Sequence, residues 1–193
     1  MKAWVARMTE EELDEEAIQK AGEILKTGGL AAFPTETVYG LGGNALDATA
    51  SRKIYAAKGR PSDNPLIVHI ARLEDLETVA RNIPAKAWRL AKTCWPGPLT
   101  MILEKTEVVP YETTGGLDTV AVRFPSNKIA QALITAAGGF VAAPSANTSG
   151  RPSPTTAAHV EEDLGERIDC ILDGGWWISD WSPRSWISPR KRL

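Results

Sequence analysis

The apolar residues of this chain follow a helical period in some stretches and form short continuous runs in others. Residues 13–25 carry an apolar stripe of helical period that ends at Gly28 and Gly29, and Thr9 to Glu12 has the pattern of a capping box for this helix. Further helices are predicted over residues 51–57, 73–81, 84–94, 127–137 and 155–164. The short runs predict strands at residues 1–8, 30–33, 66–70, 99–103, 119–124, 140–143 and 168–172. This alternation of strands and helices favours an α/β fold.

Length and composition are typical of one compact domain, since the chain has 193 residues, of which 43% are hydrophobic and 24% charged. The net charge of −2 argues against a global positive field for nucleic acid. Cys94 and Cys170 are isolated and there are two histidines, so neither a zinc site nor a disulfide framework is indicated. The chain shows no signal peptide and no long apolar segment, so we expect a cytoplasmic protein without membrane contact.

Residues 56–70 form the stretch with the clearest candidate chemistry. Lys58 and Arg60 stand on either side of a glycine at the end of a predicted helix, and a loop with two prolines follows. Glycine lets the backbone approach a ligand closely, while Lys and Arg supply a point charge and a planar fork for phosphate or carboxylate. The alternative is a structural helix end whose cations complement the helix dipole.

Two more polar loops follow predicted strands. Residues 34–45 are rich in hydroxyls and glycines, and the alternation of Thr35, Thr37 and Tyr39 predicts that these side chains point the same way. Residues 144–155 place polar side chains and one arginine at a strand's C-terminal end, where ligands of open α/β sheets usually bind. Sheet-forming threonines and a Ser/Pro-rich linker are the structural alternatives. Neither Gly-x-Gly-x-x-Gly nor a P-loop occurs in the sequence.

Two strand ends carry further candidate residues. Arg123 lies near the end of the predicted strand 119–124, and a buried guanidinium without a partner or ligand is costly. His69 lies at the end of the strand 66–70, where a lone histidine is more often structural than functional.

Together, five motifs of this chain resemble the YrdC family, the threonylcarbamoyladenylate synthases. The motifs are Phe33-Pro-Thr-Glu-Thr-Val-Tyr-Gly-Leu41, Lys58-Gly-Arg60 with Pro61 to Pro65, Trp95-Pro-Gly-Pro-Leu-Thr100, Val122-Arg-Phe-Pro125, and Ser145-Ala-Asn147 through Gly150. Each motif alone is weak, but their joint occurrence in order, across about residues 10–175, is highly specific. The resemblance implies a single three-layer α/β domain of mixed α+β character, with an open, strongly twisted mixed sheet, flanking helices and a cationic concave surface.

The resemblance also implies an activity, the condensation of L-threonine, bicarbonate and ATP to threonylcarbamoyl-AMP and pyrophosphate. The implied partners are a threonylcarbamoyl transferase complex that modifies adenosine beside the anticodon, and contact with tRNA or double-stranded RNA. By the same resemblance, the threonine-binding residues are Thr37, His69 and Arg123. The ATP-binding residues are Lys58, Arg60, Asn64, Thr119, Ser145, Asn147 and Ser153, with Lys58 and Arg60 as the catalytic pair and no metal ligand in the protein.

The residue chemistry is consistent with such a reaction. The amine of threonine can attack bicarbonate or carbon dioxide, and the carbamate oxygen can displace pyrophosphate at the α-phosphorus, so no side-chain nucleophile is needed. Catalysis would come from positioning and charge neutralisation, with a divalent ion such as Mg²⁺ bridging phosphate oxygens. Arg123 suits a carboxylate as a bidentate fork, and His69 could hydrogen-bond the amino acid or accept a proton.

Two other function classes are weighed against this one. A non-catalytic RNA-binding or ribosome-maturation factor could use Lys58, Arg60, Arg123 and Arg151 as a phosphate platform, although the acidic net charge and the shortage of loop aromatics count against it. A lyase acting on a sugar phosphate would need an acidic pair for metal-assisted enolisation, and no such pair is evident. Cooperative binding of ATP and threonine would favour the synthase, and salt-sensitive RNA binding the platform.

The composition changes abruptly after Gly175. Residues 176–193 hold four of the seven tryptophans and two Ser-Pro-Arg repeats, with neither strand alternation nor a helical stripe. The family resemblance implies instead a Ser-Thr-Val strand and an Arg-Pro-Gly turn, which supply a threonine-contacting serine and an ATP-contacting arginine. We therefore expect a YrdC-like domain over residues 1–175 and an atypical tail over 176–193. A shifted reading frame or replaced tail that impairs activity is one hypothesis, and a genuine C-terminus that docks its tryptophans is the other.

Overall fold

A computed structural model describes residues 2–175 and 184–187 of the chain. The helices are α1 (Glu15–Lys26), α2 (Ala48–Lys58), α3 (Leu76–Val79), α4 (Ala85–Cys94), α5 (Tyr111–Thr114), α6 (Lys128–Ala136) and α7 (Ala157–Leu164), with a 3-10 turn, η1 (Leu73–Asp75), before α3. The strands are β1 (Trp4–Arg7), β2 (Ala31–Phe33), β3 (Gly40–Asn44), β4 (Ile67–His69), β5 (Ala80–Arg81), β6 (Leu99–Lys105), β7 (Thr119–Arg123), β8 (Val141–Ala142), β9 (Cys170–Asp173) and β10 (Arg184–Ile187).

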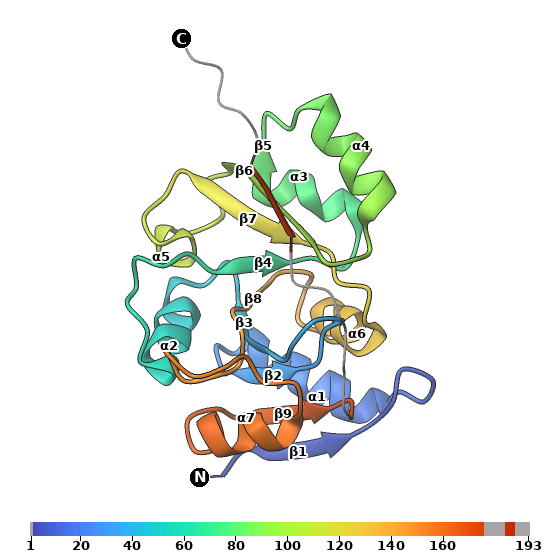
Figure 1. Cartoon of the computed structure of the whole chain (residues 1–193), viewed down its shortest axis with the longest axis vertical. Coiled ribbons are helices and arrows are strands. Elements are labelled where there is room, and N and C mark those ends of the chain that lie inside the picture. Colours follow the sequence, from blue (N-terminus) through green and yellow to red (C-terminus); the bar gives the residue numbers. More distant parts are fainter. Residues whose placement is uncertain (1, 176–183, 188–193) are drawn as a thin grey trace.

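The strands form one mixed sheet in the order β1-β9-β2-β3-β8-β4-β7-β6-β10, with β5 paired to β6. The pairs β1/β9, β2/β9, β4/β7 and β6/β10 are parallel, and the others are antiparallel. Figure 1 shows β1 and β9 side by side although they come from opposite ends of the sequence. The predicted fold class, a single mixed α/β domain, is confirmed.

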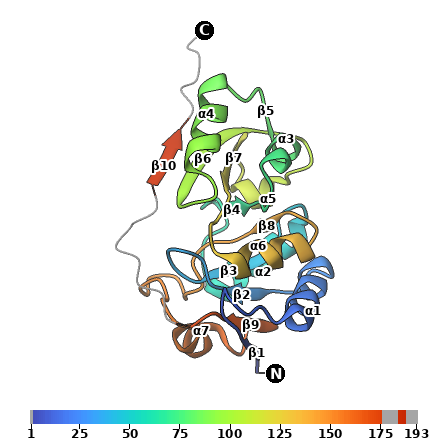
Figure 2. The ribbon, with the colours of Figure 1, turned by 90° about the vertical axis from the view of Figure 1, so that its right-hand side faces the viewer.

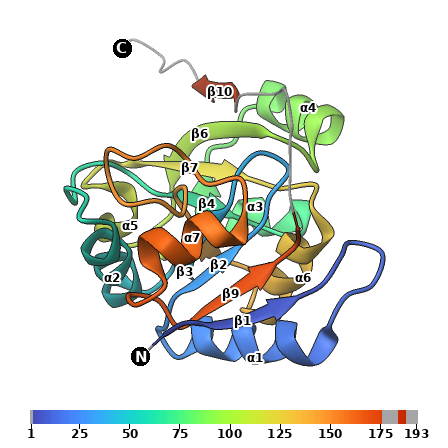
Figure 3. The same ribbon diagram turned by 60° about the horizontal axis from the view of Figure 1, so that its bottom comes forward.

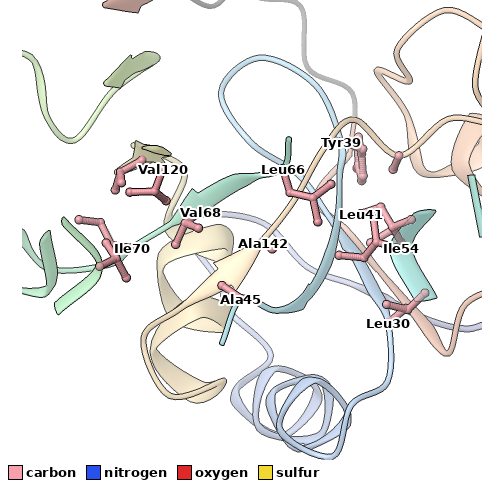
Figure 4. Packing of buried hydrophobic residues seen from close by; sticks show 14 of the residues in the cluster. Leu30, Tyr39, Leu41, Ala45, Ile54, Leu66, Val68, Ile70, Val120 and Ala142 are labelled. Carbon is pink, nitrogen blue, oxygen red and sulfur yellow. The ribbon is translucent and has the colours of Figure 1, made fainter. Parts of the chain in front are cut away.

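Helices cover both faces of the sheet because alternate strand residues belong to two separate cores. Phe33 and Val141 pack with residues of α1 and α6, whereas their neighbours Ala32 and Ala142 pack in the core that also contains residues of α2, α3, α4 and α7. Figure 2 shows α1 and α6 near each other beside the sheet, and Figure 3 shows α7 close to β9. Figure 4 shows the second core, where residues of α2, β3, β4 and β8 meet.

The two ends of α2 set the path of the chain on either side of this helix. Asp47 caps α2 by accepting a hydrogen bond from the backbone N–H of Thr49 at 2.7 Å. The helix ends at Gly59, whose φ of 61° is in the left-handed region that favours glycine. The chain therefore turns sharply between Lys58 and Arg60.

The first helix starts later than its sequence pattern predicts. Asp14, not Thr9, caps α1 and accepts from the N–H of Ala17 at 2.9 Å. Thr9 instead accepts from the N–H of Glu12 at 3.1 Å in a turn before the helix. An aspartate next to two further carboxylates at the positive end of the helix dipole outcompetes the threonine.

Residues 40–44, which were expected to be loop, form β3 in the middle of the sheet. Three of the five residues are glycine, so their intrinsic strand propensity is low. A Cβ on Gly42 would lie 2.9 Å from Phe33 Cε1 and 2.9 Å from Val141 Cγ1. The glycine therefore makes room for its neighbours in the core, and packing decides the strand.

Three other segments differ from the sequence prediction. Residues 73–81 form η1, α3 and the short strand β5 instead of one helix. The stretch 105–118, for which neither a helix nor a strand was predicted, contains α5. Residues 184–187, where no strand was expected, form β10 beside β6. The remaining tail residues, 176–183 and 188–193, lie outside the described part of the chain, so the domain boundary at residue 175 stays a prediction.

Within the described part, none of the helices has the length and hydrophobicity needed to cross a bilayer.

Candidate functional site

Lys58 joins the end of α2 to the loop of residues 144–155. Its Nζ donates hydrogen bonds to the backbone oxygen of Ser145, to the backbone oxygen of Asn147 at 2.6 Å and to Asn147 Oδ1 at 3.3 Å. Lys58 is only 2% exposed. The three partner oxygens are all uncharged, so the hydrogen bonds hold the ammonium in place without neutralising it. Sequence analysis placed Lys58, Ser145 and Asn147 in one site, and the fold brings them together.

Burial lowers the pKa of Lys58 to about 8, and the neighbouring positive charge of Arg60 lowers it further, while Asp163 acts in the opposite direction. The lysine therefore titrates within the range in which enzymes work. An anion bound nearby would favour the protonated form and raise this pKa again.

Arg60 lies half-buried just after the helix, and burial lowers the pKa of its guanidinium. Its Nε is buried and has no hydrogen-bond partner among the described residues. Tyr55 fixes the next loop by donating to the backbone oxygen of Asn64 at 3.1 Å, and the Asn64 side chain is exposed. Arg60 thus keeps donor capacity for an anion.

The loop 144–155 is organised by the side chain of Asn147. Its Nδ2 donates to the backbone oxygens of Thr148 at 2.8 Å and Arg151 at 2.7 Å, and its Oδ1 accepts from Ser145 Oγ at 2.5 Å. Ser153 is exposed. Arg151 is paired with two carboxylates, Asp163 and Glu162, so its charge is already balanced.

A second group of predicted residues surrounds Arg123 at the end of β7. His69 on β4 is its register partner, so both side chains leave the same face of the sheet. Arg123 is 4% exposed and donates from Nη2 to Thr37 Oγ1 at 3.2 Å. The same Nη2 lies 2.8 Å from Oε1 of Glu36, a residue that the sequence did not single out. Glu36 lies inside the Pro-Thr-Glu-Thr motif. A charged residue in this otherwise uncharged motif was the sequence feature that could have identified Glu36 as a candidate site residue.

His69 is held as a neutral imidazole. Burial lowers its pKa to about 3, and the positive charge of Arg123 contributes to this decrease. Hydrogen bonding to the backbone of Ile67 and Val141 raises the pKa, but by less. Nδ1 lies 3.1 Å from the Ile67 oxygen, which assigns the proton to Nδ1. The edge of the ring meets Phe33 at a centroid distance of 6.2 Å. Of the two roles expected for His69, the low pKa favours hydrogen bonding over proton acceptance, because so weak a base does not take up a second ring proton at neutral pH.

The turn between β2 and β3 connects the two groups. Glu36 and Thr37 in this turn contact Arg123. The backbone of Tyr39 bonds to the loop that holds Lys58, donating to Pro154 O at 2.9 Å and accepting from Ala146 N at 2.8 Å. The Lys58 group and the Arg123 group are therefore parts of one framework.

The row of hydroxyls expected in this turn is only partly formed. Thr35 and Thr37 share a hydrogen bond of 3.0 Å between their hydroxyls. The hydroxyl of Tyr39 points elsewhere and donates to the backbone oxygen of Gly175 at 2.9 Å. The residues form a turn and not an extended strand, so the alternation of side chains does not continue to Tyr39.

Two threonines, Thr119 and Thr100, lie on the strands around Arg123. Thr119, predicted to bind ATP, lies at the start of β7 and is separated from Arg123 by the length of the strand. Ala121 pairs with Ile67 on β4, which places Thr119 on the side of the loop that carries Asn64. Thr100 on β6 is the register partner of Arg123 and its buried Oγ1 has no partner among the described residues. Thr100 was not predicted to have a role, although it lies in one of the family motifs.

Two further features of the described residues bear on where a ligand could bind. The described residues contain no group of three His, Cys, Asp or Glu side chains placed to hold a metal ion. A depression between the end of β1 and the start of α1 is lined by Arg7, Glu12, Asp14 and Asp173 among others, and none of the predicted site residues reaches it.

Comparison with known proteins identifies the family. A family model named for Sua5, YciO and YrdC, and described as telomere recombination, matches residues 23–184. The chain belongs to the Sua5/YciO/YrdC family. The resemblance inferred from the five motifs is thereby confirmed.

Curated members of the family share substantial identity with the chain. A threonylcarbamoyl-AMP synthase of Pyrococcus abyssi is 58% identical over 165 residues, covering 86% of this chain and 48% of the relative. One of Bacillus subtilis is 51% identical and covers 90% of this chain and 51% of the relative. The chain thus spans about half the length of these relatives. A shorter synthase of Halorhodospira halophila is 36% identical, and the match covers 81% of this chain and 82% of that protein.

Solved structures of the family agree with the fold. The crystal structure of P. abyssi Sua5 complexed with L-threonine has a TM-score of 0.87 and 54% identity, covering 92% of this chain and 51% of that one. Escherichia coli YciO has a TM-score of 0.80 and 28% identity, covering 91% of this chain and 85% of that one.

Proposed function

We propose that this chain condenses L-threonine, bicarbonate and ATP to threonylcarbamoyl-AMP and pyrophosphate. The observation that carries the proposal is the buried Lys58, a cation whose hydrogen-bond partners are all uncharged, next to an arginine with an unused donor. Two buried or half-buried cations that form no ion pair within residues 2–175 favour an anionic ligand. The naming of the relatives as threonylcarbamoyl-AMP synthases supports ATP as that ligand.

The second half of the site suits an amino acid. Arg123 can bind a carboxylate, Thr37 lies within hydrogen-bond distance of the same guanidinium, and His69 offers a neutral ring beside them. The complex of P. abyssi Sua5 with L-threonine, at 54% identity, supports threonine as this amino acid.

The chain's own residues would act by positioning and by charge. Lys58 and Arg60 would neutralise charge on the triphosphate as pyrophosphate leaves, and Ser145 and Asn147 would fix the loop around it. The α-ammonium of threonine would first lose a proton, and the free amine would attack the carbon of bicarbonate to give the carbamate with loss of water. A carbamate oxygen would then attack the α-phosphorus, and the bond to pyrophosphate would break. No protein nucleophile takes part. Since ATP and threonine are held by groups joined through the β2–β3 turn, binding of one would order the site for the other.

Mg²⁺ would reach the site with the nucleotide. The described residues hold no ready-made metal cluster, and Mg²⁺ is commonly bound largely by substrate phosphates and water. When bound, it would supply charge neutralisation at the phosphate oxygens. We further propose that the product passes to a threonylcarbamoyl transferase that modifies tRNA.

The alternative of a non-catalytic RNA platform has less support from the placement of the cations. Lys58 is 2% exposed and Arg123 is 4% exposed. Arg151 is bound to two carboxylates. Two of the four cations considered for the platform are thus almost fully buried and a third, Arg151, is already ion-paired, which leaves little free accessible positive charge for an extended RNA backbone.

The test is pyrophosphate release with each substrate omitted in turn. Release should require threonine, bicarbonate and ATP together. Lys58→Ala and Arg60→Ala should each slow turnover by about a hundredfold or more while the fold is retained, because each removes charge stabilisation at the phosphates. Lys53→Ala, on the same helix but bonded to the backbone of Gly28, is the matched control. Release without threonine, or full activity in both site variants, would refute the proposal.

A further inference from the structure

Glu36 is a largely buried carboxylate that receives no hydrogen bond from the described residues. Its side chain is 13% exposed, and both oxygens are buried and accept no hydrogen bond from the described residues. The nearest positive charge is Nη2 of Arg123, 2.8 Å from Oε1 but without hydrogen-bond geometry. A carboxylate withdrawn from water normally gains several donors in exchange. Glu36 therefore has acceptor capacity that the described part of the chain leaves unused.

Arg123 shows the complementary deficit. Its Nε is buried and has no partner among residues 2–175 and 184–187, while Nη2 serves both Thr37 and Glu36. A guanidinium carries five donors in a planar fork that matches a carboxylate. Arg123 can therefore take up a second carboxylate without giving up its contact with Glu36.

The two deficits together match the head group of an α-amino acid. Such a molecule carries an ammonium with three donors and a carboxylate with several acceptor sites on the same carbon atom. We propose that Glu36 binds the α-ammonium of the amino-acid substrate while Arg123 beside it binds the carboxylate. This inference rests on the proposed function and adds to it the group that recognises the amine.

The turn that carries Glu36 is held independently of Arg123. Thr35 Oγ1 accepts from the backbone N–H groups of Thr37 at 3.2 Å and Val38 at 3.3 Å, and donates to Val38 O at 2.7 Å. These bonds fix the backbone of the turn on both sides of Glu36. A glutamate that served only to neutralise Arg123 would be expected to form the paired hydrogen bonds of an arginine–carboxylate bridge. The observed contact leaves both oxygens without a hydrogen-bond donor from the described residues.

Specificity for an amine follows from this arrangement. A ligand with a hydroxyl in place of the α-amino group keeps the carboxylate for Arg123 but loses the charge attraction to Glu36. With the hydroxy analogue bound, the carboxylate of Glu36 would stay buried without the positively charged ammonium. This penalty adds to the lost contact, so the site should reject the analogue strongly. Discrimination between amine and hydroxyl at the α-carbon is therefore the property that Glu36 controls.

The experiment measures calorimetric binding of L-threonine and of its hydroxy-acid analogue, 2,3-dihydroxybutanoate, to the wild-type chain and to Glu36→Gln. The wild type should prefer threonine, and Glu36→Gln should bind threonine about tenfold or more weakly while binding the analogue as before. Glu112→Gln is the control, because Glu112 pairs with Arg52 at the surface and should leave both affinities unchanged. ATP binding to each variant checks that the nucleotide half of the site is folded.

A Glu36→Gln variant that keeps the full preference for threonine would overturn the inference and leave the proposed function standing. Tighter threonine binding would also overturn it, because Glu36 would then be a competitor for Arg123. A wild-type chain that binds no threonine would overturn both. If Glu36→Gln does not fold, Glu36→Asp replaces it. Moving the carboxylate back by one methylene must weaken threonine more than the analogue, and equal weakening contradicts the inference.

Discussion

Burial sets the protonation of the two titratable residues that matter most at the residue scale. Lys58 and His69 are both almost fully buried, and burial lowers the pKa of each. The consequences differ because an unperturbed lysine has a pKa of 10.5 and an unperturbed histidine one of 6.5. The lysine is brought into the working range of an enzyme, whereas the histidine is removed from it.

Lys58 should make ATP binding depend on pH. Its pKa of about 8 in the free protein means that the ammonium loses its proton as pH rises from 7 to 9.5. Bound phosphate favours the protonated form, so ATP affinity should fall over this interval. Calorimetric titrations across the interval should show the fall in the wild type and in Lys53→Ala, but not in Lys58→Ala. A pH-independent wild type would show that Lys58 does not carry the charge that ATP requires.

His69 should make the folded state sensitive to acid. The unfolded chain protonates this histidine below about pH 6.5, but the folded protein does so only near pH 3. The unfolded state therefore binds more protons in this window, and stability falls as pH decreases, by up to about 1.4 kcal/mol per pH unit. Chemical denaturation at pH 7, 5.5 and 4.5 should show a smaller loss in His69→Gln than in the wild type. Equal losses would mean that His69 is not the group responsible.

At the element scale, the turn after α5 packs against the loop of residues 61–65. Gly115, with φ of 61°, lies against the loop of residues 61–65, and a Cβ on it would be 2.8 Å from the backbone oxygen of Asp63. Gly116 has φ of 83° but open space around its Cβ position. Both glycines adopt a backbone conformation that L-residues disfavour, and only the first also makes a close contact.

Gly115→Ala should therefore disturb the loop that carries Asn64, whereas Gly116→Ala should not. Both variants should lose about 1 kcal/mol of stability from the left-handed conformation. Only Gly115→Ala should lose more and also weaken ATP binding, because the new methyl group displaces the Asp63 backbone. Thermal unfolding and ATP titration of the two variants make the comparison. If the two variants unfold at the same temperature and bind ATP equally well, the turn after α5 does not influence the ligand site.

Sequence patterns predicted the elements with strong periodicity and missed those decided by packing. The apolar stripe of α1 and the runs of β4, β6 and β7 were found because each pattern is local. β3 was missed because its low strand propensity is offset by packing: Gly42 makes room for Phe33 on the neighbouring strand and for Val141, which is distant in sequence. Lys58, Ser145 and Asn147 could be grouped from motifs, but the contact between Glu36 and Arg123 depends on how the β2–β3 turn meets β7.

At the scale of the whole molecule, the sheet joins segments from opposite ends of the chain. β9 lies between β1 and β2, and β10 extends the sheet beyond β6 (Figure 1). The tail hypothesis falls largely on residues outside the described ranges, and the family model extends to residue 184. We propose that the atypical sequence after Gly175 lowers ligand affinity, because it lacks the Ser-Thr-Val and Arg-Pro-Gly motifs that the family resemblance implies there.

Grafting an ending with Ser-Thr-Val and Arg-Pro-Gly after Gly175 tests this proposal. The grafted chain should release pyrophosphate faster at low threonine concentration and unfold at a higher temperature than the native chain. Both chains are assayed at equal concentration with the same substrates. Equal rates would instead establish residues 176–193 as a working part of the protein.

The central claim is that one site joins threonine, bicarbonate and ATP. Its most direct test is mass spectrometry of the nucleotide product formed from ¹⁵N-threonine, ¹³C-bicarbonate and ATP. The account predicts a single adenylate that carries both labels, in amounts equal to the pyrophosphate released, and its loss in Lys58→Ala. AMP or ADP formed without either label would contradict the account.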